Sequence, residues 1–78
     1  MTREEFGLQL YDCITLIGGI VGLQQQIAGK IHYGDGLGVT ELTARRIALR
    51  QELAVKLPQL HQEALKQVVE RYPQVASL

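Results

Sequence analysis

The chain has 78 residues, one cysteine and a formal net charge of zero. This length corresponds to a single domain near the lower limit for a self-sufficient core, and a lone cysteine excludes an intrachain disulfide. Zero net charge disfavours a dedicated nucleic-acid binder, because phosphate neutralisation normally requires a positive excess. Since 46% of the residues are hydrophobic, we expect extra stability to come from oligomerisation.

The first helix is predicted to span residues 3–32. Thr2 and Glu5 match a capping box just before an apolar run, which is typical of a helix start. Apolar residues then recur in steps of four and three, as in a coiled-coil seam. The predicted seam consists of Phe6, Leu10, Cys13, Ile17, Ile20, Gln24, Ile27 and Ile31. Gln24 is its one polar member, and it either fixes the register of a partner helix or lies exposed at the edge.

Glycines lie along one side of this predicted helix. Gly18 and Gly22 fall on the same line as Tyr11. Glycine inside a helix costs about 1 kcal/mol relative to alanine, so the pattern predicts close approach by another helix. The pair Gly18-Gly19 also admits a broken helix or a hairpin turn between strands. The capping box and the sustained spacing favour the helix.

The apolar run 13–23 has eleven residues, which is too short to span a bilayer, and we interpret it as part of a core helix. Two acidic residues stand where a secretory signal would carry basic ones. With one free cysteine, these features predict a cytoplasmic protein. A small membrane-associated protein is one alternative functional hypothesis.

A glycine-rich loop is predicted at residues 33–39, with Gly29 or Gly34 ending the first helix in a left-handed conformation. Thr40 is the predicted cap of a second helix over 40–57, which ends before Pro58. A third helix is predicted over 58–72.

The first helix is expected to pack antiparallel on the second. Residues 1–73 then form one helical domain and residues 74–78 a loose tail.

The second helix carries apolar residues on two sides, which indicates that it lies between two neighbours. One of these neighbours is expected to belong to a second copy of the chain. The candidate helix–helix interface residues are Gly18, Gly22, Tyr11, Gln24, Ile47, Ala48 and Ala54.

The sequence offers no candidate catalytic, metal-binding or cofactor-binding residues. Cys13 lies on the apolar seam and is interpreted as a small hydrophobe. His32 and His61 lack ligand partners at helical spacing. The loop glycines lack the lysine and hydroxyl residue of a phosphate-binding loop, and they are interpreted as turn residues.

One basic cluster, formed by Arg45, Arg46 and Arg50, supports an alternative function. Arg46 and Arg50 share one side of the second helix and are the candidate phosphate contacts. The segment 39–46, Val-Thr-Glu-Leu-Thr-Ala-Arg-Arg, resembles the first helix of helix-turn-helix regulators, which implies DNA binding. The short turn that should follow is absent, since residues 47–53 continue as good helix.

The sequence therefore predicts an all-α protein, a small helical bundle completed by dimerisation. Its predicted function is that of a non-enzymatic interaction module, acting as an accessory, regulatory or assembly factor. Its expected partners are a second copy and an unidentified protein.

Overall fold

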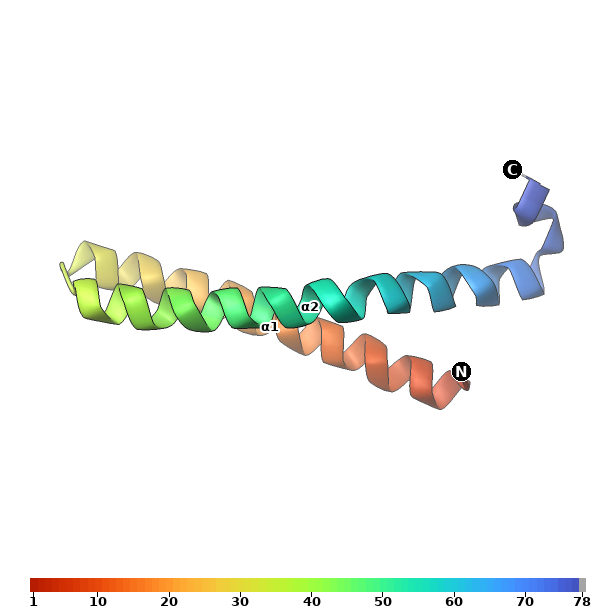
Figure 1. The fold of residues 1–78 in the computed structure, drawn as a ribbon, viewed down its shortest axis with the longest axis horizontal. Helices are drawn as coiled ribbons and strands as arrows, with labels where there is room; N and C mark the ends of the chain where they lie inside the picture. Colours follow the sequence, from red (N-terminus) through yellow and green to blue (C-terminus); the bar gives the residue numbers. More distant parts are fainter. Residues whose placement is uncertain (78) are drawn as a thin grey trace.

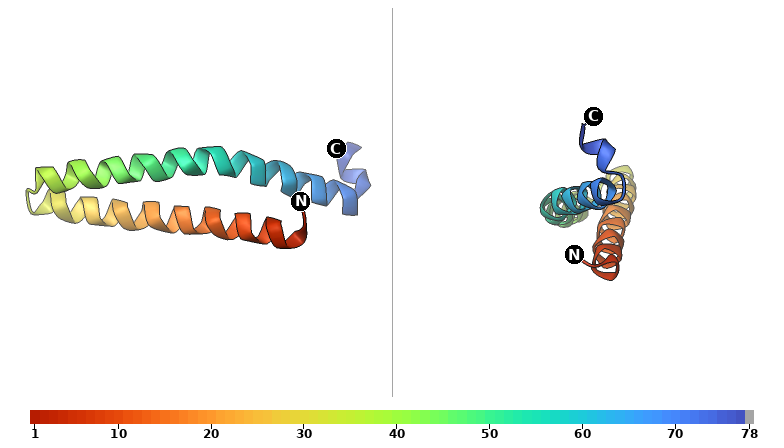
Figure 2. Two further views of the ribbon diagram at one scale, coloured as in Figure 1. Left: turned by 60° about the horizontal axis from the view of Figure 1, so that its bottom comes forward. Right: turned by 90° about the vertical axis from the view of Figure 1, so that its right-hand side faces the viewer.

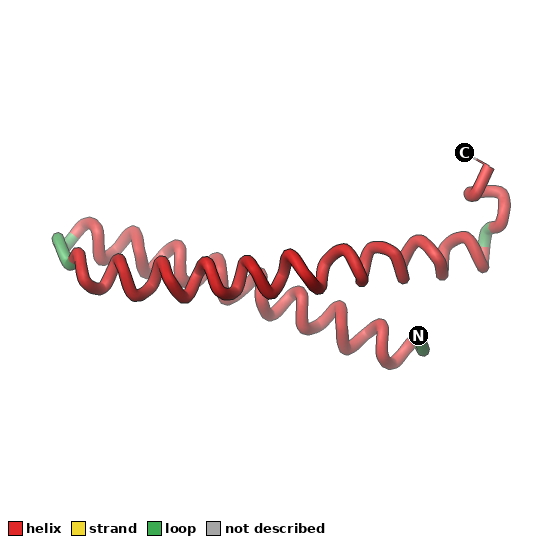
Figure 3. Tube along the Cα trace, viewed as in Figure 1, coloured by secondary structure: helices red, strands yellow, loops and turns green. Residues whose placement is uncertain are grey.

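The computed structural model describes residues 1–77 as a long helical hairpin followed by one short helical segment. Helix α1 spans Arg3–His32, helix α2 spans Gly36–Arg71, and the 3-10 helix η1 spans Pro73–Ser77. The two long helices run antiparallel (Figure 1). Within residues 1–77, only residues 1–2, the turn and residue 72 are not helical (Figure 3). The molecule measures 55 × 26 × 15 Å. The predicted all-α class and the antiparallel packing of the first helix are confirmed.

Helix α1 begins and ends as the sequence predicts. The Thr2 hydroxyl accepts a hydrogen bond from the Glu5 amide at 3.1 Å, and the acidic side chains of the first turn favour the positive end of the helix dipole. Gly18 and Gly19 lie inside the continuous helix, so the alternatives of a break or a hairpin turn are wrong.

The turn between the helices is built by one glycine and one aspartate. Gly34 adopts a φ of +73°, a left-handed conformation that glycine tolerates without strain. The Asp35 carboxylate then caps α2 by accepting a hydrogen bond from the Gly38 amide at 2.9 Å. It also lies 3.2 Å from the Lys30 ammonium, which ties the end of α1 to the start of α2.

The predicted cap at Thr40 is wrong, because α2 begins four residues earlier, at Gly36. Asp35 accepts a hydrogen bond from the third amide of the helix, so the first turn already has its cap. The Thr40 hydroxyl instead donates to the Gly36 carbonyl at 3.0 Å, inside the helix.

The predicted division into helices 40–57 and 58–72 is also wrong. Helix α2 continues through Pro58, whose ring lies exposed to solvent. Proline removes one helical hydrogen bond, but packing on α1 holds the helix on both sides of it. Figure 2 shows that α2 curves along its length with its convex side away from α1, the direction expected when solvent-side hydrogen bonds are lost.

The core is a single seam between the two helices, with residues spaced alternately by three and four. Such a heptad spacing is typical of an antiparallel coiled coil. From α1 the seam takes Phe6, Gln9, Cys13, Leu16, Ile20, Leu23 and Ile27. From α2 it takes Val39, Leu42, Arg46, Leu49, Leu53, Lys56, Leu60, Glu63 and Gln67. Within residues 1–77, Cys13, Leu16, Ile27 and Leu60 are the only buried residues.

The seam predicted for α1 is half correct. Phe6, Cys13, Ile20 and Ile27 do face α2, but the other four predicted members lie on the surface: Leu10, Ile17, Gln24 and Ile31. The seam rotates toward Gly19, where a Cβ atom would lie only 3.1 Å from the Leu49 side chain. Because Gly19 has no side chain, α2 packs close on that side, and Ile14, Ile17 and Val21 on the other side of α1 are left exposed.

Segment η1 turns away from the end of α2 (Figure 1), and none of its residues is buried. The sequence predicted a loose tail for residues 74–78. Residues 74–77 form the last part of η1, and residue 78 lies outside the described residues.

Candidate functional site

The candidate site is an exposed apolar surface along one side of the hairpin, which we call the apolar flank. On α1 it comprises Leu10, Ile14, Ile17, Val21, Gln24, Ala28 and Ile31, all exposed. These residues themselves follow a spacing of four and three, so α1 carries a second seam beside the one that packs on α2. Ile14 is 57% exposed and Ile31 is 63% exposed, values far from those of a core.

Helix α2 contributes the other half of the apolar flank, on the same side of the hairpin. Its residues are Ile47, Arg50, Ala54, Leu57, His61 and Val68, all exposed. A shallow groove of about 450 Å³ runs between the helices here. The groove is lined by Ile17, Val21 and Gln24 of α1 and by Arg50, Ala54 and Leu57 of α2. It shows that the two exposed seams form one surface.

The opposite side of the hairpin is charged. Lys56 lies 3.1 Å from Glu52 and 3.8 Å from Asp12. The hydrogen bond with Glu52, and then the charges of Glu52 and Asp12, raise the pKa of the Lys56 ammonium above its ordinary value of 10.5. Such a surface is well solvated, so the hairpin has one polar and one apolar side.

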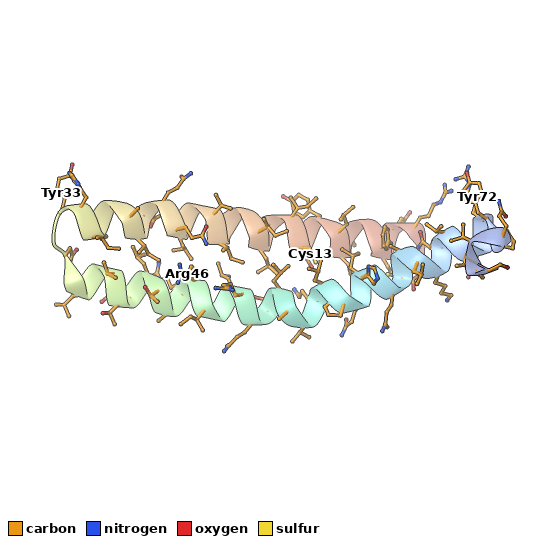
Figure 4. The ribbon with its side chains drawn as sticks, turned by 90° about the horizontal axis from the view of Figure 1, so that it is seen from above. Cys13, Tyr33, Arg46 and Tyr72 are labelled. Atoms are coloured by element: carbon orange, nitrogen blue, oxygen red, sulfur yellow. The ribbon has the colours of Figure 1, made fainter. Side chains whose placement is uncertain are left out.

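Two residues singled out in the sequence lie between the helices (Figure 4). Cys13 is 2% exposed and packs as a small hydrophobe in the seam. Arg46 occupies a seam position, and its Nε atom is buried without a hydrogen-bond partner among the described residues.

Arg50, by contrast, is exposed on the apolar flank. The two candidate phosphate contacts therefore do not form one exposed basic surface. Arg45 is exposed, and it belongs to neither the seam nor the apolar flank.

The structure brings together three of the seven candidate interface residues. Gln24, Ile47 and Ala54 lie on the apolar flank. The remaining four lie on the outer surfaces of the helices, away from the seam: Tyr11, Gly18 and Gly22 on α1, and Ala48 on α2. Within residues 1–77, a Cβ atom added at Gly18 or Gly22 would meet nothing within 4 Å, so no helix of the same chain uses this glycine surface.

Most of the apolar flank was missed by sequence reasoning. Leu10, Ile17 and Ile31 were predicted to belong to the buried seam of the first helix, whereas each is 41–63% exposed. The signal was present, since residues 10 to 31 repeat the same spacing one position away from the true seam. Choosing between two overlapping seams requires the position of the second helix.

Helix α1 is also long and apolar enough to cross a membrane, by length and composition alone. Only 11% of its most apolar eighteen-residue window is buried in the hairpin. The eleven-residue run considered from the sequence is shorter than this window. Core helices of soluble proteins pass the same criterion, so it describes the length and composition of α1 and does not place the helix in a membrane.

For metal binding, no group of three or more His, Cys, Asp or Glu side chains is clustered within residues 1–77. No family model, curated protein or solved structure matches the chain. The surface itself is therefore the basis for a functional proposal.

Proposed function

We propose that this chain is a non-enzymatic protein-interaction module that acts by helix packing, and that it works as a homodimer joined through the apolar flank. The observation that carries the proposal is the continuous apolar surface shared by α1 and α2. Exposed apolar surfaces of this extent are typical of interaction sites. A role as an accessory, regulatory or assembly factor with a further protein partner fits the same surface.

The exposed area of the hairpin supports a second copy as the partner. The chain exposes 6078 Å² at a mass of 8.7 kDa, whereas a monomer of this mass exposes about 4,700 Å² by the usual scaling. The excess of roughly 1,300 Å² exceeds the ~800 Å² that each partner contributes to a typical stable interface. Four helices around one core would bury both seams of α1.

The test compares two matched substitutions by sedimentation equilibrium. Val21 is 47% exposed on the apolar flank, and Val55 is 63% exposed on the outer side of α2. We expect Val21→Asp to convert a dimer into a monomer, because removing a carboxylate from water in this apolar groove costs more free energy than pairing with Arg50 returns. Val55→Asp should leave the dimer unchanged. A wild-type chain that is monomeric and fully folded at micromolar concentration would contradict the proposal.

A second candidate function rests on the length and apolar character of α1. A chain that uses its apolar flank on lipid would float with neutral phosphatidylcholine vesicles and would be monomeric without them. The Val21→Asp chain would then lose flotation rather than dimerisation. The cytoplasmic location predicted from the sequence stays a prediction.

A further inference from the structure

The groove on the apolar flank contains two polar side chains among apolar ones. Gln24 comes from α1 and Arg50 from α2, and both line the groove together with Ile17, Val21, Ala54 and Leu57. Any partner that covers this groove removes water from the Arg50 guanidinium. A charged group that is desolvated without an acceptor is strongly destabilising. The occupant must therefore bring an acceptor to Arg50.

If the occupant is a second copy, the apolar flank offers two side chains that can accept a hydrogen bond, Gln24 and His61. His61 lies eleven residues from Arg50, about 16 Å along α2, which is too far when residues of the two copies stay at the same level. None of the flank's thirteen residues, as defined within the described part of the chain, is an aspartate or a glutamate. The amide oxygen of Gln24 is the one side-chain oxygen that the flank provides. A guanidinium N–H donates readily to such an oxygen, so a self-complementary pair requires Gln24 of one copy against Arg50 of the other.

The register of the hairpin fixes how far apart these two residues lie along the helices. Asp12 meets Lys56 and Gly19 meets Leu49 across the seam, and both pairs of residue numbers add up to 68. By the same relation, Arg50 stands level with position 18 of α1. Gln24 is six residues closer to the turn, a separation of about 9 Å at ~1.5 Å per residue. The two long side chains together span this distance.

From this geometry we propose that each α1 packs on the partner's α2, with Arg50 of each copy donating a hydrogen bond to Gln24 of the other. A two-fold axis parallel to the helices gives this arrangement. It keeps each residue of one copy level with the same residue of the other copy, and it forms the Arg50–Gln24 contact twice. A two-fold axis across the helices would instead place α1 on α1 and Arg50 against the partner's α2. The inference rests on the proposed homodimer, and the area given above supports that occupant.

Mixing two chains tests the pairing directly. One chain carries Gln24→Glu and Arg50→Ala, and the other is wild type. In the mixed dimer the new carboxylate at position 24 meets an intact Arg50, a pair that neither the wild-type homodimer nor the variant homodimer contains. Native mass spectrometry should show the ratio of mixed dimers to homodimers raised roughly tenfold above the 1:1 ratio of random pairing, because charge-assisted pairs are stronger than neutral ones.

Each result of this mixture has a defined meaning. If Arg50 and Gln24 interacted only within one chain, or not at all, the mixed dimer would form at the random proportion of one half, and the inference would be overturned while the homodimer stood. If wild-type chains formed no dimer, the proposed function would fail as well.

Disulfide trapping gives an independent readout of the same arrangement. In a Cys13→Ala background, Ile14→Cys and Ala54→Cys place single thiols at levels that match by the register relation. Mild oxidation of the mixture should join one variant to the other, because α1 then lies on the partner's α2. Disulfides that join Ile14→Cys chains only to one another would overturn the inference. Far-UV circular dichroism checks that both variants keep their helices.

Discussion

At the residue scale, the Asp35 side chain holds the turn through two contacts. It accepts from the Gly38 amide and lies 3.2 Å from Lys30, and these contacts, the amide first, lower the pKa of its carboxyl below the ordinary value of 3.8. A Cβ atom at Gly38 would lie 2.5 Å from the Asp35 carboxylate. Gly38 is therefore needed so that the carboxylate can fold back over the first turn of α2.

The lowered pKa of Asp35 sets a pH dependence with a definite sign. A carboxyl whose pKa is lower in the folded state stabilises the fold fully above the unfolded value of 3.8 and loses this contribution as the pH falls through the lower folded value. We expect the difference in unfolding free energy between wild type and Asp35→Asn to be constant near neutral pH and to shrink below pH 3.8. Urea titrations at several pH values measure it. A difference that grows in acid would contradict this assignment.

A second prediction at this scale separates two neighbouring glycines. Within the hairpin, Gly18 faces open space, whereas a Cβ at Gly19 would lie 3.1 Å from the Leu49 side chain. Gly18→Ala should therefore stabilise α1 by up to ~1 kcal/mol, and Gly19→Ala should gain clearly less because Leu49 must shift. Denaturant unfolding compares them. A destabilising Gly18→Ala would show instead that another backbone packs on the glycine surface of α1.

At the element scale, Pro58 is the feature of α2 that departs most from helix preference. Its ring lies on the exposed side of a continuous helix. Pro58→Ala restores the missing amide and is expected to stabilise the hairpin by about 1–3 kcal/mol. Thermal unfolding followed at 222 nm measures the gain. An unchanged or lower midpoint would mean that the proline stabilises α2 where it stands.

The elements also show what sequence reasoning can reach. Local signals were sufficient for the cap of α1 at Thr2, because caps and turns depend on a few neighbouring residues. They left Gly29 and Gly34 as the two candidates for the left-handed residue, and the structure has it at Gly34. The break at Pro58 was predicted from an intrinsic preference that packing along α1 overrides. The true seam and the apolar flank could not be separated, because only the position of α2 distinguishes Leu16 from Ile17.

At the scale of the whole molecule, the two sides of the hairpin differ in kind. One side carries the ion pairs of Lys56, and the other carries the apolar flank with its groove. A two-helix hairpin has one helix–helix contact, so it leaves about half of each helix surface exposed. The proposed dimer gives α1 a second contact, which explains why α1 carries two seams in its sequence.

The seam between the helices changes character along its length, and this has a consequence for how the hairpin opens. Near the turn it is formed by Leu23, Ile27 and Leu42, whereas toward the chain ends it includes Gln9, Glu63 and Gln67. Gln67 donates a hydrogen bond to Glu63 of the same helix, at 3.4 Å, and across the hairpin, among the described residues, Glu63 has only the Met1 ammonium, at 3.7 Å.

Burial of the polar end contributes little free energy, so the two helices should separate there first. On folding, their contacts should form in sequence from the turn toward the chain ends. Amide hydrogen exchange should therefore slow progressively from residues 60–70 toward residues 38–50 of α2. Gln9→Leu should slow exchange at the polar end alone, and uniform exchange along α2 would show that the hairpin opens as one unit. The turn at Gly34 is then the place where folding of the chain begins.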